Sequence, residues 1–320
     1  MSRAITLVAV AALAALWPSA QASAQDTLKV ATGQRGNWNA AIGELGQRAG
    51  IFKKHGLLLE ILYTSGSGET QQAVISGAVD VGTAVGTMGA MSAFTKGAPI
   101  RIIGAETTGG ADYWYVVASS AIKTMKDTDG KTIAYSTNGA STHGVVLAFI
   151  KELGLKAKPV ATGNPASTLT QVMTGQVDVG WGSPPFGIKE IDENKIRVLA
   201  LATDLPVVRG QTIRVLATNA EALAKRRDAL TRYLEAYRET LDYMYGDNPQ
   251  VIKDYAEHAG LSVEIARRTR DQFFPKALLN PDEIKGLDIM MPEAISLKFI
   301  SDPLSANQLK ELIQIPPRRN

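Results

Sequence analysis

The stretch from Ala134 to Gly154, AYSTNGASTHGVVLAFIKELG, decides how the rest of the chain is interpreted. A short apolar segment leads into a small polar loop, and apolar residues then recur at helical spacing, which predicts a strand, a loop and a helix. Ser141 is the expected N-cap of the helix and Gly154 the residue that ends it. Such a helix start combines unpaired N–H groups with a positive dipole end, so this loop can hold an anion. The alternative is an ordinary capped turn without a ligand.

Two further segments, 98 positions apart, share one pattern. Residues 73–82 read AVISGAVDVG and residues 171–180 read QVMTGQVDVG. In both, a predicted helix ends at a glycine and a strand begins Val-Asp-Val-Gly. This repetition favours two similar α/β lobes, and chance similarity is the alternative. We expect Asp80 and Asp178 to have matching structural roles, because they occupy the same place in the two segments.

Strand and helix patterns alternate from Thr27 to Leu201, which predicts an α/β fold with a largely parallel sheet. Ligands in open α/β sheets bind beyond the carboxyl ends of the strands, so the loops after Gly82 and Gly180 should face a common cleft. After Ala217 the pattern becomes helical. We predict one long helix from the Asn219 cap to Gly246, followed by shorter helices that pack on the first lobe.

Composition and the N-terminus limit the possible partners. Lys and Arg total 34 and Asp and Glu total 31, giving a net charge of +3 without a basic block, which disfavours nucleic acid and acidic membranes as partners. A basic start, a short apolar run and small residues before Ala24 predict a signal peptide over residues 1–24, against the alternative of an uncleaved anchor. The chain has no cysteine, so neither a disulfide nor a lipid-bearing cysteine is expected. We therefore expect a free periplasmic protein.

Several segments together resemble one known family. The segments are GIFKKHGLLLEI, SGSGETQQAVISGAVDVG, DGKTIAYSTNGASTHGVVLAFIKELGL and TGQVDVGWGSPP. Their order and spacing are similar to those of the nitrate-, sulfonate- and taurine-binding proteins of ABC importers, over nearly all of the chain after residue 25. The resemblance implies a bilobal periplasmic-binding-protein fold of type II, with two crossovers, in which each lobe is a mixed sheet flanked by helices.

The resemblance also implies a division of the chain. Lobe 1 would comprise residues 25–120 and 212–320, and lobe 2 residues 121–211. The two crossovers would lie near Ser119 to Ile122 and near Asp204 to Gln211. The lobes would close on a small solute and deliver it to a membrane permease. A monomer without cofactor or metal is expected.

Ligand contacts in this family come from the loops at the ends of the strands. Carried over to this sequence, they fall on Arg35, Trp38, Ser67, Gly68, Thr87, Met88, Asn138, Ser141, Thr142, Trp181 and Ser183. Trp38 and Trp181 would sandwich an apolar part of the ligand, and Arg35 would pair with its charged head. The alternatives are two core tryptophans and a solvated arginine.

The expected ligand is a small organic monoanion such as a sulfonate or a carboxylate, because no cluster of basic residues suits a doubly charged solute. Two alternatives remain open. One is an uncharged pyrimidine of the thiamine-precursor type, and the other is a sensor that presents its solute to a membrane receptor. Catalysis is not expected, since the sequence shows no triad, metal pair or nucleophile elbow.

Overall fold

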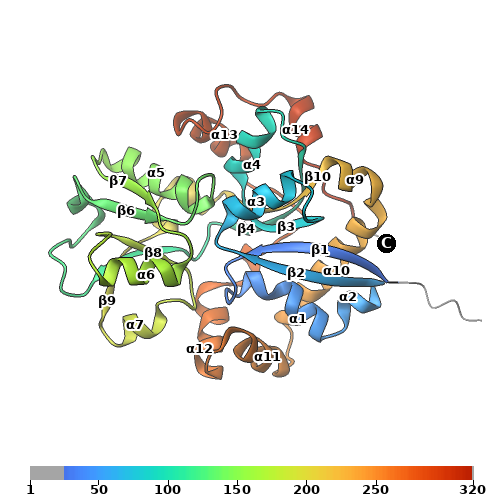
Figure 1. The fold of residues 1–320 in the computed structure, drawn as a ribbon, viewed down its shortest axis with the longest axis horizontal. Helices are drawn as coiled ribbons and strands as arrows, with labels where there is room; N and C mark the ends of the chain where they lie inside the picture. The colour runs from blue at the N-terminus through green and yellow to red at the C-terminus, as the bar shows by residue number, and fades with distance from the viewer. Residues whose placement is uncertain (1–24, 319–320) are drawn as a thin grey trace, which may run out of the picture.

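The computed structural model describes residues 25–318. The predicted signal peptide, residues 1–24, lies outside the described residues, as do residues 319 and 320. The chain forms two sheets, each flanked by helices, side by side in Figure 1. No helix within the described part is both long and apolar enough to span a bilayer.

The first sheet has the strand order β2-β1-β3-β10-β4. Its strands are β1 (Asp26–Gly33), β2 (Leu57–Thr64), β3 (Val81–Gly86), β4 (Ile100–Thr108) and β10 (Thr212–Asn219). β1 pairs in parallel with β2 and β3, whereas β10 runs antiparallel to β3 and β4. Every residue of β3 and β10 is buried, as is typical of central strands that are covered on both faces.

The second sheet is assembled from two groups of strands. One group has the order β8-β5-β9 and the other pairs β6 with β7. The strands are β5 (Tyr113–Val117), β6 (Thr132–Tyr135), β7 (Lys158–Ala161), β8 (Gly180–Gly182) and β9 (Ile196–Leu201). The N–H of Ala134 donates to the carbonyl of Val179 at 2.8 Å, which joins β6 to the segment that leads into β8. We call the residues that pack on the first sheet the first half, and those on the second sheet the second half.

β5 differs from the sequence expectation. The lobe division predicted from the sequence placed residues 113–117 in the first lobe, but β5 pairs with β8 and β9 of the second sheet. The chain therefore passes from the first sheet to the second between Thr108 and Tyr113, before the crossover expected at Ser119 to Ile122. The aromatic and β-branched run YWYVV suits either sheet, so local pattern alone could not assign it. The lobe boundaries stay a prediction.

Helices cover both sheets. Those that follow strands of the first sheet are α1 (Ile42–Arg48), α2 (Ile51–Lys54), α3 (Ser67–Ile75) and α4 (Thr87–Thr95). The second half contains α5 (Ser141–Leu153), α6 (Pro165–Met173), α7 (Ile188–Asp192) and α8 (Pro206–Arg209). The C-terminal helices are α9 (Ala220–Lys225), α10 (Arg227–Met244), α11 (Gln250–Ala259), α12 (Val263–Arg268), α13 (Leu287–Ser296) and α14 (Ala306–Leu312).

The C-terminal helices divide between two cores of the first half. α10 and α11 share a core with α1, α2 and the strands β1 and β2, while α13 and α14 share another with α4, β4 and β10 (Figure 1). The long helix predicted after Asn219 is broken at Arg226, which has φ −126°. The Arg226 guanidinium donates to Asp80 Oδ1 at 2.7 Å and to the carbonyl of Thr27 at 2.6 Å, so these contacts hold the break against the first sheet.

The two similar segments of the sequence, residues 73–82 and 171–180, also have similar structures. Helices α3 and α6 cover the equivalent residues 67–75 and 165–173, and each leads to one of the two Val-Asp-Val-Gly segments. Asp80 Oδ2 accepts the backbone N–H of Lys29 at 2.8 Å, and Asp178 Oδ2 accepts that of Thr132 at 2.9 Å. Each carboxylate thus fixes the neighbouring strand of its own sheet, and the expected matching roles are confirmed.

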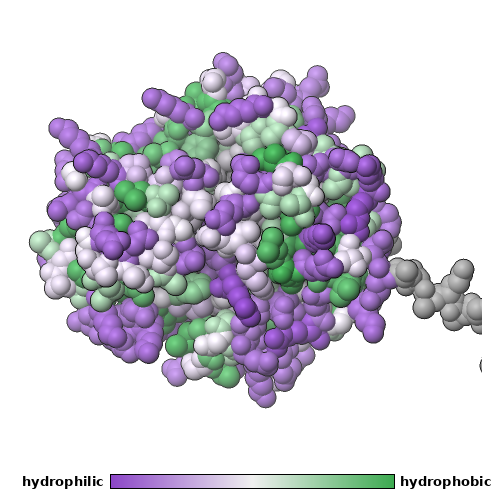
Figure 2. All heavy atoms as spheres, in the orientation of Figure 1, coloured by the Kyte–Doolittle hydropathy of each residue, from purple (hydrophilic) through white to green (hydrophobic). Residues whose placement is uncertain are grey.

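Figure 2 shows mainly hydrophilic side chains on one face, with apolar ones dispersed among them. Six large apolar side chains are exposed within residues 25–318. Leu58 and Leu62 lie on β2, and the others lie on four different elements: Met173, Leu201, Val263 and Ile289. Single exposed apolar residues of this kind are normal for a protein surface.

Candidate functional site

A polar cavity lies where the two halves meet. Its volume is about 310 Å³, part of it open to solvent. The first half contributes Gly33, Gln34, Asn37, Asn39, Ala40, Ser67, Ala84 and Arg214, and the second half contributes Ser136, Ser141 and Thr142. Most of these residues lie at the carboxyl ends of strands or in the loops that follow, where α/β sheets bind ligands. We call this space the polar cavity.

Arg214 supplies the positive charge of the polar cavity. The side chain comes from the central strand β10 and is only 3% exposed. Nη2 donates to Asp112 Oδ2 at 2.5 Å and Nε donates to Ser141 Oγ at 3.1 Å, while Nη1 has no protein partner. Burial by itself would lower the pKa of Arg214. The nearby carboxylates of Asp112 and Glu106 raise the pKa by more than burial lowers it, so the net pKa lies above its ordinary value and the guanidinium stays charged. Its free N–H arm suits an anionic oxygen.

The second half contributes hydroxyl groups and the start of α5. Thr142 Oγ1 accepts the backbone N–H of Ser136 at 3.0 Å and lies 2.8 Å from Ser136 Oγ. The N-cap of α5 is Ala140 and not Ser141 as predicted, and no side chain caps the helix. Ser141 is the first residue of the helix, and its hydroxyl accepts a hydrogen bond from Arg214 Nε. The first turn of α5 therefore keeps its positive end facing the polar cavity.

Other polar groups of the first half are buried at the polar cavity without partners. Ser67 Oγ, Asn37 Oδ1 and Asn39 Oδ1 all lack a hydrogen bond. The amide of Asn37 donates to Gln34 Oε1 at 3.1 Å, so its orientation is fixed by the loop after β1. Buried polar atoms without partners are costly, and a ligand that pairs with them would recover that cost.

Glu106 lies beneath the polar cavity on β4 and is 2% exposed. Oε1 accepts Asn39 Nδ2 at 2.7 Å, and Oε2 accepts the backbone N–H of Ala84. Ala84 has φ +55°, a left-handed conformation that is uncommon for alanine, so Glu106 holds a strained part of the cavity wall. Burial raises the pKa of the Glu106 carboxyl, against the effect of its two hydrogen bonds and of Arg214. The protonated form of Glu106 is therefore more favoured in the folded protein than it would be in water.

The two halves touch on both sides of the polar cavity. The N–H of Gly68 donates to Thr137 Oγ1 at 2.9 Å. On the other side, a Cβ on Gly89 would lie 2.2 Å from the carbonyl oxygen of Gly139, and a Cβ on Gly86 would lie 2.8 Å from the nitrogen of Ser141. Only glycine permits this approach of α4 to the loop before α5. The structure thus has the halves closed on each other.

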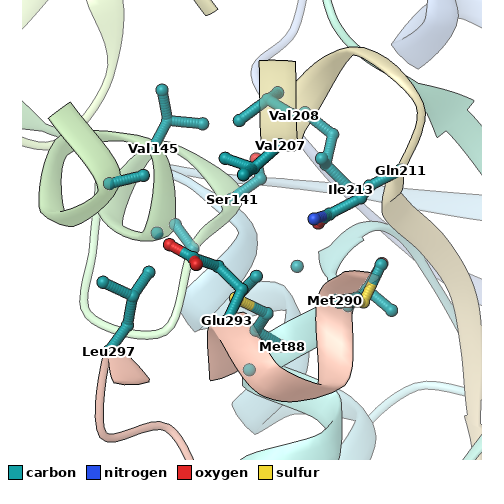
Figure 3. Close-up of a pocket in the computed structure, with 16 residues that line it drawn as sticks. Met88, Ser141, Val145, Val207, Val208, Gln211, Ile213, Met290, Glu293 and Leu297 are labelled. Carbon is teal, nitrogen blue, oxygen red and sulfur yellow. The ribbon is translucent and has the colours of Figure 1, made fainter. Parts of the chain in front are cut away.

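Figure 3 shows a second, mainly apolar cavity, and both Gly86 and Ser141 are among the residues that line it. Its volume is about 410 Å³, part of it open to solvent. Residues of α4, α5, α8 and α13 line it, together with the connection into β10: Gly86, Thr87, Met88, Gly89, Ala140, Ser141, Gly144, Val145, Ala148, Val207, Val208, Gln211, Ile213, Met290, Glu293 and Leu297. We call this space the apolar cavity, and Ser141 borders both cavities.

Comparison with known proteins defines the family. The NMT1/THI5-like family model matches residues 39–251, which is more than half of the chain. The chain belongs to the NMT1/THI5-like family. No curated protein matches the sequence.

Solved structures show that this NMT1/THI5-like protein has the periplasmic-binding-protein fold. The alkanesulfonate-binding protein SsuA from Xanthomonas axonopodis pv. citri, bound to MOPS, matches with a TM-score of 0.75 at 17% identity, covering 91% of this chain and 98% of that one. The aliphatic sulphonate binding protein SsuA from Escherichia coli gives 0.69 at 19% identity, covering 92% and 94%. The nitrate-binding protein NrtA from Synechocystis PCC 6803 gives 0.69 at 12%, covering 91% and 86%. The fold and the resemblance seen in the sequence are confirmed.

The predicted ligand contacts of the NMT1/THI5-like protein fall in different places. Ser67, Ser141 and Thr142 line the polar cavity, and Thr87 and Met88 line the apolar one. Gly68 bridges the halves through its backbone. Asn138 accepts a hydrogen bond from Tyr135 Oη at 2.6 Å at its Oδ1 and borders an open groove beside His143.

The two tryptophans are not brought together. Trp38 is fully buried in the core of the first half, where Nε1 donates to Tyr245 Oη at 2.9 Å. Trp181 is equally buried, but in the core of the second half. Neither lines the polar cavity, so the structure offers no sandwich between them.

Arg35 and Ser183 lie outside the polar cavity as well. Arg35 is exposed at the outer edge of the gap between the halves, with its guanidinium 5.4 Å from the ring centre of Tyr63. Ser183 is fully buried behind β8, and its hydroxyl has no partner. The arginine that lines the polar cavity is Arg214, which was not among the predicted contacts.

Sequence reasoning missed Arg214, Asn37, Asn39, Ser136 and Glu106. A usable signal existed for Arg214, which interrupts the apolar run of β10 between Ile213 and Val215. A charge at a buried strand position needs a partner or a function.

Proposed function

We propose that this protein binds a small organic monoanion, such as a sulfonate or a carboxylate, in the polar cavity and delivers it to an ABC importer. The supporting observation is the buried Arg214 guanidinium, whose Nη1 lacks a partner. One anionic group would pair with this arm and with the start of α5, whereas the halves close around the rest of the ligand.

Charge balance favours a single negative charge on the ligand. Arg214 is already paired with Asp112, and Glu106 lies nearby as a second acid. With Glu106 protonated, an incoming monoanion adds one negative charge to a neutral pair. A dianion would add two negative charges to the same pair, and the larger excess charge in a buried site costs more.

The solved sulfonate- and nitrate-binding proteins of the same fold support this ligand class. By analogy with these binding proteins, we propose that the protein is a periplasmic carrier without catalytic activity. It would be exported by a cleaved signal peptide, and its partner would be an inner-membrane permease. Presentation of the solute to a membrane receptor remains the alternative partner.

A second candidate ligand is an uncharged pyrimidine. The amide oxygens of Asn37 and Asn39 have no partner at the polar cavity, and such acceptors pair with the amino group of a ring. The monoanion is favoured because a neutral ring would leave Arg214 Nη1 unpaired.

A thermal-shift screen of residues 25–320 tests the proposal. Candidate ligands are alkanesulfonates, taurine, aliphatic and aromatic carboxylates, nitrate and pyrimidines. A ligand that binds only the native state at about 100 times its Kd adds about 2.7 kcal/mol of stability, and so raises Tm by several degrees. A hit among the monoanions, confirmed by calorimetry, supports the proposal. Hits restricted to uncharged pyrimidines would favour the second candidate, and a screen without hits in either class would contradict both.

A further inference from the structure

The apolar cavity has features that the proposed function does not use. Its lining is mostly aliphatic, yet Figure 3 shows the Glu293 carboxylate and the Gln211 amide among those side chains. Both residues are more than nine-tenths buried, at 6% and 1% exposure. Each has one polar atom without a partner, Oε1 of Glu293 and Nε2 of Gln211. Two unpaired polar atoms in one apolar cavity indicate a place for a molecule that pairs with them.

Glu293 is already neutralised from one side. Its Oε2 accepts from Lys151 Nζ at 2.8 Å, and this ion pair joins α13 of the first half to α5 of the second. An additional cation in the apolar cavity would exceed the available negative charge, and an anion would be repelled by the carboxylate. A neutral molecule is therefore favoured.

We propose that the apolar cavity is a second binding site, separate from the polar cavity, for a small neutral aliphatic molecule such as a primary amide or an alcohol. Its N–H or O–H donates to Glu293 Oε1, and its oxygen accepts from Gln211 Nε2. Its alkyl part packs on the side chains of Met88, Val145 and Met290. The inference goes beyond the proposed function, because it does not depend on Arg214 or on the anion.

The apolar cavity is lined by both halves of the protein, so a molecule bound in it should affect how the halves close on each other. α5 and α8 belong to the second half, while α4 and α13 belong to the first, and all four contribute to the lining. A molecule that contacts both halves binds best when they have the arrangement seen here. Its binding therefore shifts the population toward the closed form.

Methyl NMR of protein labelled at the methionine methyl groups tests the site directly, with isobutyramide as the probe. Met88 and Met290 line the apolar cavity, whereas Met125 and Met244 lie in the cores away from it and report non-specific effects. Isobutyramide should shift the signals of Met88 and Met290 in a saturable manner and leave those of Met125 and Met244 in place. Unchanged Met88 and Met290 signals, or equal shifts of all four, would overturn the proposal.

Two matched compounds test the polar contacts. 3-Methylbutan-2-one has the shape of isobutyramide but cannot donate a hydrogen bond, so it should bind about ten-fold more weakly. Isobutyrate carries a negative charge and should also bind the apolar cavity at least about ten-fold more weakly, whatever it does in the polar cavity. Equal affinity of all three compounds would contradict the roles of Glu293 and Gln211.

A substitution at the rim tests the location. Val207 is half-buried and lines the apolar cavity, so Val207→Phe should fill part of it and abolish the saturable shifts. Leu201→Phe introduces the same ring at an exposed position outside the cavity and should leave the shifts unchanged. Binding of isobutyramide that survives Val207→Phe in a folded protein would overturn the assignment. Binding that is lost in Val207→Phe and kept in Leu201→Phe supports it, and the binding of monoanions is measured separately on the same variants.

Discussion

Arg214 and Asp112 form a buried ion pair whose cation also faces the proposed anion. Arg214 is 3% exposed and Asp112 is fully buried, and Nη2 lies 2.5 Å from Oδ2. The Arg214 side chain therefore has two roles: it neutralises Asp112 within the fold, and in our proposal it pairs with the ligand. Substitution of Arg214 alone would mix the two effects, so a paired substitution is needed to separate them.

We expect Arg214→Gln to destabilise the fold by about 3–5 kcal/mol, because Asp112 is left as an unpaired buried charge. The double variant Arg214→Gln with Asp112→Asn removes that charge and should recover most of the stability in chemical denaturation. Calorimetry of the double variant should still show affinity for the monoanion reduced by at least about 30-fold, the equivalent of about 2 kcal/mol. Wild-type affinity in the stable double variant would exclude Arg214 as the anion-binding group.

Glu106 predicts a pH dependence of binding. Burial raises the pKa of this carboxyl in the folded protein, so the acid takes up its proton at a higher pH than in the unfolded chain. Protonation removes a negative charge near Arg214, and affinity for a monoanion should therefore increase as the pH falls through the pKa of Glu106 in the folded protein. Calorimetry across the acid range measures the effect.

Glu106→Gln is the matched control for this prediction. The amide is close to the carboxyl in shape, and the free Oδ1 of Asn39 can accept from it after a flip of the Asn39 amide. The part of the pH dependence of binding that comes from Glu106 should disappear in this variant.

Glu106 also predicts a pH dependence of stability. Because its pKa is raised in the folded protein, the stability that it contributes falls as the pH rises from the pKa of the unfolded chain through the pKa of the folded protein. This trend should also be absent in Glu106→Gln. An unchanged pH profile would assign the dependence to another group.

At the scale of elements, α4 and the loop before α5 meet through glycine. Gly89 lies within α4, where alanine is preferred over glycine by about 1 kcal/mol, so Gly89→Ala should not weaken the helix itself. Its Cβ would lie 2.2 Å from the carbonyl oxygen of Gly139 when the halves are closed. We therefore expect the ligand to bind about ten-fold more weakly or worse, as for a closed form disfavoured by about 1.4 kcal/mol or more.

Gly43→Ala is the control for this substitution. Gly43 lies in α1, and its Cβ would meet only the flexible ends of two side chains, Ile61 at 3.2 Å and Leu59 at 3.5 Å, away from the contact between the halves. Calorimetry should give wild-type affinity for Gly43→Ala. Equal affinity of Gly89→Ala and the wild type would show that this contact is not part of the ligand-bound form.

Local patterns predicted most elements but not their partners. The repeat of α3 and α6 was visible because each unit is continuous in the sequence. The break at Arg226 was not visible in the sequence, because it depends on contacts with Asp80 and Thr27. The sheet to which β5 belongs was not visible either, because it depends on pairing with β8 and β9.

The site divides in the same way. The hydroxyl loop from Ser136 to Thr142 was found because it is local. Two contacts predicted in it, Ser141 and Thr142, line the polar cavity, and so does Ser136, which was not among the predicted contacts. Arg214 reaches Ser141 from a strand more than 70 positions further along the chain, and no local pattern encodes that approach. The buried Trp38 and Trp181 show the converse, since large aromatic residues near a predicted site also suit the core.

At the scale of the whole molecule, closure without a ligand is costly. The closed arrangement leaves Arg214 Nη1 and Ser67 Oγ buried and unpaired, at about 1–3 kcal/mol for each group. Against this cost stand contacts between the halves, among them the hydrogen bond from Gly68 to Thr137 and the ion pair of Lys151 with Glu293. Lys151 is 41% exposed, so solvent weakens its contribution.

We therefore expect the halves to open in the absence of ligand, by rotation about the two connections between the sheets, and to close when an anion pairs with Arg214. Small-angle X-ray scattering of residues 25–320 should show a larger radius of gyration without ligand than with a saturating monoanion. Gly89→Ala should keep the larger radius at ligand concentrations that close the wild type, because its Cβ opposes the closed contact and not the anion itself. If the wild type without ligand were already as compact as the complex, the energy of anion binding would not be needed for closure, and the unpaired groups of the polar cavity would have to be satisfied by water.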